Sequence, residues 1–127
     1  MSNTNLARTN LDFIALHTAD LDAARQYYSE VLGFTPAGSS PPNAAVFQQS
    51  GGASLAVRLP QPHEVQQPPF GAGVSVWFGV PDAAQYHQRL VEKGANVLTP
   101  PTPGPFGNMF SVQTPDGHTL TFHEASS

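Results

Sequence analysis

The sequence has no cysteine, few charged residues and no long hydrophobic run. Without cysteine there are no disulfides, no thiol nucleophile and no zinc site built on thiolates. The five lysine and arginine residues are scattered, and with a net charge of −4 they form no basic surface for nucleic acid. No apolar stretch approaches the roughly 18 residues of a membrane-spanning helix, and the N-terminal segment lacks the apolar core of a secretory signal. We therefore expect a soluble, cytoplasmic protein that binds neither nucleic acid nor membrane.

Proline and glycine are abundant instead, with 13 and 11 residues respectively. The prolines cluster at 41–42, 60–69 and 100–105. Because proline removes a backbone donor and restricts its neighbour, each cluster predicts a loop. With 127 residues, of which 39% are hydrophobic, the chain is long enough for one domain with its own core. We predict a single domain over 1–127, with one module at about 10–60, a linker at 60–72 and a second module at about 73–124.

The two halves repeat the same order of local signals. Each begins with a strand-like run, followed by an aspartate typical of a helix N-cap and a glycine typical of a helix stop. The runs lie at 12–18 and 74–80, the caps are Asp20 and Asp82, and the stops are Gly33 and Gly94. Three short strand candidates follow each helix, at 34–37, 44–49 and 54–59, and at 95–98, 109–113 and 119–123. The pattern predicts an α+β fold of two tandem βαβββ modules.

Several segments in this order resemble those of a known superfamily. They are DLDAARQYYSEVLGF from Asp20, VPDAA from Val80, Lys93-Gly, Phe106-Gly, and TPDGH from Thr114. Together they resemble the vicinal oxygen chelate superfamily, which contains glyoxalases, extradiol dioxygenases and bleomycin-resistance proteins. The resemblance implies a cupped mixed sheet around a central cavity, with the helices outside, and a homodimer.

Metal enzymes of that superfamily take one His or Glu ligand from the first and the last strand of each module. Counted from the helix caps and the last turns, the matching positions here are Phe13, Ala56, Ser75 and Thr121. None of these is an ordinary ligand for a divalent cation. We therefore expect no metal and no cofactor, which puts glyoxalase and dioxygenase activity in doubt. The chain is then closest in character to the metal-free binding proteins of that superfamily.

Strand alternation assigns side chains to two faces. The predicted helix-facing set is apolar: Ile14, Leu16, Leu55, Val57, Val74, Val76, Phe78, Leu120 and Phe122. The opposite face mixes aromatic and polar side chains, as ligand pockets do. With the neighbouring Pro/Gly-rich loop it supplies the candidate ligand-binding residues: Phe13, His17, Arg58, Trp77, Thr121, His123, Phe106 and Met109. We expect His63, His87 and His118 to be solvated.

Two classes of function remain open. One is a binding protein that sequesters an aromatic or heterocyclic small molecule, such as an antibiotic, against Trp77 and Phe13. The other is a metal-independent enzyme, a lyase or isomerase, with His17 or His123 as general base and Arg58 stabilising an anion. Core positions for Trp77 and Phe13, and structural roles for both histidines, are the competing interpretations.

Overall fold

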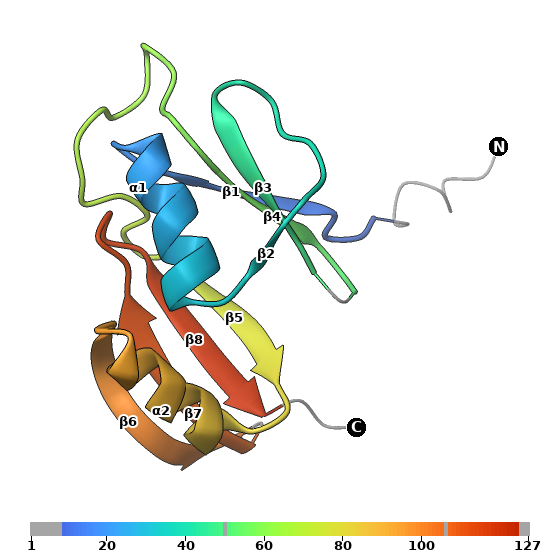
Figure 1. Cartoon of the computed structure of the whole chain (residues 1–127), viewed down its shortest axis with the longest axis vertical. Helices are drawn as coiled ribbons and strands as arrows, with labels where there is room; N and C mark the ends of the chain where they lie inside the picture. The colour runs from blue at the N-terminus through green and yellow to red at the C-terminus, as the bar shows by residue number, and fades with distance from the viewer. Residues whose placement is uncertain (1–8, 50, 106, 125–127) are drawn as a thin grey trace, which may run out of the picture.

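The structure, a computed structural model, describes residues 9–49, 51–105 and 107–124 (Figure 1). The first module contains β1 (Phe13–His17), α1 (Leu21–Gln26), η2 (Tyr27–Val31), β2 (Thr35–Pro36), β3 (Ala44–Gln48) and β4 (Ser54–Arg58). The second contains β5 (Ser75–Val80), α2 (Ala83–Glu92), β6 (Asn96–Gly104), β7 (Gly107–Gln113) and β8 (Thr119–Glu124). The predicted pair of βαβββ modules is confirmed.

The helices begin and end where the capping residues predict. The Asp20 and Asp82 carboxylates accept hydrogen bonds from the backbone N–H groups of Ala23 and Gln85, at 3.1 and 3.0 Å. Each satisfies one of the orphan donors of a helix N-terminus. The first helix changes after Gln26 into one π-helical turn, η2, in which the Leu32 N–H donates to the Tyr27 carbonyl. The apolar spacing predicted a helix here but not this change in its winding.

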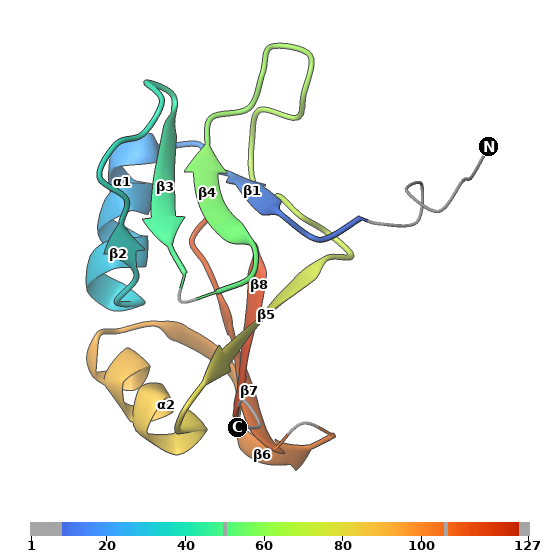
Figure 2. The same ribbon diagram turned by 90° about the vertical axis from the view of Figure 1, so that its right-hand side faces the viewer.

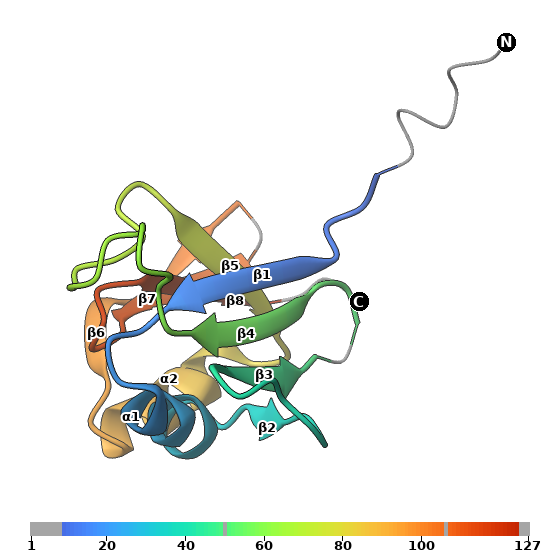
Figure 3. The same cartoon turned by 90° about the horizontal axis from the view of Figure 1, so that it is seen from above.

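Each module forms its own four-stranded mixed sheet (Figure 2). The strand orders are β1-β4-β3-β2 and β5-β8-β7-β6, with the first and last strands of each module paired in parallel. The two sheets are not joined to each other, so β1 and β5 are both edge strands. These two edges lie across one another on the side of the molecule away from the helices (Figure 3).

The two helices lie on the same side of the molecule, one above the other in Figures 1 and 2, and share one core with both sheets. Aromatic rings fill much of this core: Phe122 stacks on Phe78 and on Phe110, with ring centroids 5.3 and 5.4 Å apart. The Tyr86 hydroxyl of α2 donates a hydrogen bond to the Leu32 carbonyl of the first module. The core therefore connects the modules through their helix-facing sides. Among the described residues, neither helix has the length and apolar character needed to cross a bilayer.

Two local predictions are wrong. The proline cluster at 100–105 was expected to be a loop, but β6 continues through it to Gly104. Strand β6 lies at the sheet edge, where proline is tolerated, and register shifts around Thr99 accommodate the cluster. Val74 was assigned to the helix-facing set, yet it is 58% exposed because it precedes β5 and lies outside the ladder.

Candidate functional site

We call the side of each sheet that faces away from the helices its cup-facing side. The predicted helix-facing residues of β4 and β8, Leu55, Val57, Leu120 and Phe122, are buried in the core. Ala56 and Thr121, which lie between them on the opposite face, are buried too. Phe13 on β1 and Trp77 on β5 are 51% and 43% exposed, which is unusual for large aromatic side chains. Both cup-facing sides therefore present aromatic surface to solvent in this chain.

A first cavity, of about 440 Å³, lies against the cup-facing side of the first module. Phe13, Ala56 and Arg58 form its sheet wall, while Pro60, Gln61 and Pro62 of the linker close one end. We call it the Arg58 cavity, because Arg58 is the charged residue in its lining. Three of its lining side chains, namely Phe13, Ala56 and Arg58, lie at positions that strand alternation had assigned to the cup.

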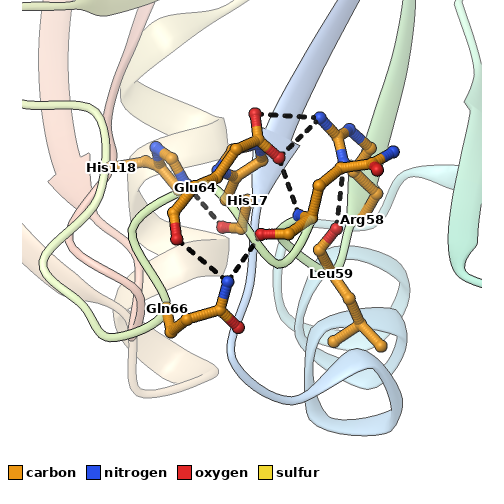
Figure 4. A network of polar contacts seen from close by, with 7 residues as sticks. His17, Arg58, Leu59, Glu64, Gln66 and His118 are labelled. Atoms are coloured by element: carbon orange, nitrogen blue, oxygen red, sulfur yellow. Dashed lines mark hydrogen bonds and ion pairs between the residues drawn. The ribbon is translucent and has the colours of Figure 1, made fainter.

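Arg58 is held by a carboxylate of the linker (Figure 4). Its Nη2 donates to both oxygens of Glu64, at 3.1 and 3.3 Å, and its Nη1 donates to the Leu59 carbonyl at 3.0 Å. Glu64 also accepts a hydrogen bond from the Gln61 backbone N–H at 2.7 Å. That bond and the Arg58 guanidinium lower the pKa of the Glu64 carboxyl from its usual 4.5. The sequence analysis did not identify Glu64 as the partner of Arg58.

His17 pairs with Arg58 in the β1–β4 register and also lies beside Glu64, at the end of β1 (Figure 4). Its Nε2 is 3.6 Å from Glu64 Oε2. It lines a second cavity, the His17 cavity, of about 690 Å³ between the linker and the edges of β1 and β5. The lining is largely apolar and includes Phe70, whose ring meets His17 edge-on with centroids 5.8 Å apart. Glu64 thus stands between the two cavities, in contact with both His17 and Arg58.

His118 is buried, so the expectation that it is solvated is wrong. Its Nε2 donates to the His17 carbonyl at 2.7 Å, and its ring stacks on Phe70 with centroids 6.2 Å apart. A Cβ added at Gly71 would lie 2.6 Å from His118 Nδ1, so the linker backbone passes directly over the imidazole. The turn before β8 also holds the linker, since the Phe70 N–H donates to the Asp116 carbonyl at 2.9 Å. Local sequence could not reveal these contacts because the partners are far apart in the chain.

The other candidates gather on the cup-facing side of the second module. Trp77 and His123 lie side by side, with ring centroids 5.8 Å apart. Met109 pairs with His123 in the β7–β8 register, which places it in the same group. Phe106 lies outside the described residues. Trp77 borders a third cavity, the Trp77 cavity, of about 440 Å³, together with Leu11, Ser54 and Gly79.

The four superfamily metal positions carry no set of donors that fits a divalent cation. Phe13 and Ala56 have no donor atom, and both line the Arg58 cavity. The Ser75 and Thr121 hydroxyls lie 3.3 Å apart, and Thr121 is 2.8 Å from the Ser111 hydroxyl. These neutral hydroxyls satisfy one another and offer a polar floor rather than a chelating site. Within the described ranges, no group of three or more His, Asp or Glu side chains is arranged to hold a metal ion.

The structure brings the candidates together in parts rather than around one centre. Phe13 and Arg58 share one cavity, His17 lines the second, and Trp77 borders the third. The His17 and Trp77 cavities both include Ile14 and Val76, the positions at which the two edge strands approach each other. These two cavities therefore lie on either side of the place where β1 and β5 approach each other.

Comparison with known proteins gives the family context. The family model described as "Glyoxalase/Bleomycin resistance protein/Dioxygenase superfamily" matches residues 10–122. No curated protein sequence matches the chain significantly.

Solved structures with the same fold come from several bacteria. TioX from Micromonospora sp. ML1 has a TM-score of 0.73 and 22% identity, over 93% of this chain and 100% of that chain. A glyoxalase-related enzyme from Fulvimarina pelagi has a TM-score of 0.71 and 26% identity, over 90% of this chain and 86% of that chain. A glyoxalase/bleomycin resistance protein/dioxygenase from Nocardioides has a TM-score of 0.71 and 24% identity, over 91% and 83%. These similarities extend over nearly the whole chain.

Proposed function

The chain belongs to the glyoxalase/bleomycin resistance protein/dioxygenase superfamily, and from this premise we propose that it binds and sequesters an aromatic or heterocyclic small molecule, such as an antibiotic. The observation that carries the proposal is the exposure of Trp77 beside His123 on the cup-facing side. A large aromatic side chain that is 43% exposed contributes only part of its area to the core. The exposed part of its surface can contact a planar ligand.

The surroundings of Trp77 suit binding better than metal-assisted chemistry. The nearby hydroxyls of Ser75 and Ser111 can exchange hydrogen bonds with a ligand but carry no charge, and the buried Thr121 hydroxyl supports both of them. Ligand pockets typically combine aromatic walls with a few such polar groups. We propose Thr121 and Met109 as further residues of the site beside Trp77, and Phe13, Arg58 and His17 as contacts in the two neighbouring cavities. Phe106 stays a candidate contact.

A test of the proposal starts from the protein as purified. Mass spectrometry under non-denaturing conditions, followed by denaturation, should release a co-purified small molecule with an aromatic ring. The released compound should quench or shift the emission of Trp77 when it is added back, and Trp77 is the only tryptophan in the chain. A compound that binds without affecting Trp77 would contradict the proposed site.

We also propose that a second copy of the chain covers the cup-facing sides in a two-fold symmetric homodimer. Leu11, Phe13, Val74 and Trp77 are large apolar residues on or beside the two edge strands, and each is at least 43% exposed. Exposed apolar edges favour association. Light scattering across a wide concentration range should give the mass of a dimer, whereas a monomer throughout would contradict this assembly.

A metal-independent enzyme is the second candidate, and the contact between His17 and Glu64 favours it. A carboxylate 3.6 Å from an imidazole nitrogen can orient that imidazole as a general base. Arg58, however, is already paired with Glu64, which leaves it poorly placed to stabilise a developing anion. Turnover screening of the released compound, with His17→Gln and His123→Gln as comparisons, separates catalysis from binding. Turnover that depends on one of these histidines would favour the enzyme.

A further inference from the structure

Arg58 supplies the positive charge in the lining of the Arg58 cavity, whose other lining residues are uncharged. An arginine at a cavity wall usually recognises a carboxylate, sulfonate or phosphate. Here the guanidinium already has such a partner, because both oxygens of Glu64 lie within 3.3 Å of Nη2. The cation is therefore neutralised from within the chain.

The linker holds Glu64 in that position through its own hydrogen bonds. The Gln61 N–H donates to Glu64 Oε1 at 2.7 Å, and the Gln66 side chain donates to the carbonyls of Gln61 and Glu64 at 2.6 and 2.9 Å. Glu64 is only half-buried, with a side-chain exposure of 27%, and Arg58 matches it at 29%. This pair is thus organised before any ligand arrives. A ligand in the Arg58 cavity meets the pair from the Arg58 side, because Glu64 itself lines the neighbouring His17 cavity.

An anionic ligand and a neutral ligand meet this arrangement differently. An anion near Arg58 must approach a carboxylate of the same sign or displace it from a preformed ion pair. An uncharged ring loses nothing by the presence of Glu64, since it can pack on Phe13 and Val46 of the cavity wall without touching the pair. The same cavity therefore distinguishes ligands by charge.

We infer that Glu64 is a specificity-determining residue, which reserves the Arg58 cavity for uncharged planar ligands and excludes organic anions. The inference rests on the proposed binding function and names the class of ligand. It predicts that neutralising Glu64 frees Arg58 and creates an anion site in the same cavity.

Two dyes with the same ring system provide the test. N-phenyl-1-naphthylamine is uncharged, and 8-anilinonaphthalene-1-sulfonate carries a sulfonate. Their affinities are measured by fluorescence titration at low salt for the unmodified protein and for Glu64→Gln. The glutamine keeps an oxygen that can accept from the Gln61 N–H, so the linker turn retains its hydrogen bond. Asp22→Asn is the matched control, because Asp22 also pairs with an arginine, Arg25 at 3.3 Å, on an exposed helix.

Glu64→Gln should bind the sulfonate about three- to fivefold more tightly, the upper part of the range expected for releasing a partly exposed ion pair. Its affinity for the neutral dye should stay within about twofold. Asp22→Asn should change neither, and adding Arg58→Gln to Glu64→Gln should abolish the gain. The inference would be overturned if the ratio of the two affinities did not change. It would also be overturned if the variant lost affinity for both dyes equally, because Glu64 would then only stabilise the loop.

The two proposals fail in different ways. If the unmodified protein binds neither dye but Glu64→Gln gains sulfonate binding that depends on Arg58, the role of Glu64 stands and the proposed function loses its support. If no variant binds either dye, both are overturned.

Discussion

The imidazole of His118 donates a hydrogen bond to the backbone carbonyl of His17 across 2.7 Å, although 101 positions separate the two residues. The bond joins the turn before β8 to the end of β1, and so connects the two modules beside the linker. His118 is only 5% exposed, and its loss would remove the donor that satisfies the His17 carbonyl.

We predict that His118→Ala lowers the free energy of unfolding by about 1–3 kcal/mol, through the lost hydrogen bond and the lost stacking on Phe70. Urea unfolding followed by circular dichroism measures the change. His63→Ala is the control, because His63 is an exposed linker residue whose loss should change stability by less than about 0.5 kcal/mol. Equal stability of the two variants would show that this hydrogen bond and the stacking on Phe70 do not stabilise the folded chain.

Trp77 should contribute more to binding than to stability. Trp77→Ala should weaken binding of an aromatic ligand by about 1–3 kcal/mol, by analogy with the loss of stacking on a nucleic-acid base. Trp77→Phe retains an aromatic face and should weaken it less. Isothermal titration calorimetry gives the affinity and thermal unfolding gives the stability of the same variants.

The control for Trp77 is Val91→Ala, which removes another exposed apolar side chain, 51% exposed on α2. It should leave the affinity unchanged. Destabilisation of Trp77→Ala by about 3–5 kcal/mol, with unchanged affinity, would identify Trp77 as a core residue after all.

Metal analysis tests the interpretation of the four superfamily positions. After dialysis against zinc, iron, nickel and manganese and removal of excess ions, the protein should retain no stoichiometric metal there, because Phe13 and Ala56 provide no donor and Ser75 and Thr121 provide only neutral hydroxyls. Elemental mass spectrometry checks this result. One tightly bound equivalent that disappears in Thr121→Val would show that the alignment of these positions is wrong.

The linker turn should respond to acid through Glu64. The Gln61 N–H, followed by Arg58, holds the pKa of Glu64 below 4.5 in the folded state. A carboxyl with a lowered folded-state pKa stabilises the folded turn above pH 4.5, and this stabilisation is lost as the pH falls through the lowered value. The amide resonance of Gln61, followed by NMR, should therefore titrate with a midpoint below 4.5. The same resonance in Glu64→Gln should show no such titration; a midpoint at or above 4.5 would contradict the assigned contacts.

Repeated local signals were sufficient to predict the architecture. Asp20 and Asp82 each accept a bond from a backbone N–H three positions ahead, and Gly33 and Gly94 adopt positive φ angles of 82° and 83°. Such contacts depend on neighbours in the chain, so sequence spacing reveals them. Strand alternation likewise assigned Leu55, Val57, Leu120 and Phe122 to the core.

The cluster at 100–105 shows where local signals fail. Its prolines predict a loop, but the structure extends β6 to Gly104, since β7 pairs with only one edge of that strand. Whether a proline-rich segment can be a strand depends on its position in the sheet, and the pairing of strands decides that position.

By itself, the sequence determined the two modules, the apolar side of each sheet and the chemical types at the superfamily positions, because capping, periodicity and composition are properties of short segments. Only the tertiary structure decided that Glu64 pairs with Arg58 between two cavities, that His118 is buried against His17, and that Phe13 and Trp77 border different cavities. These relationships depend on how the linker folds back over β1 and how the two sheets sit on one shared core. Such contacts join distant segments, so no periodicity in the sequence predicts them.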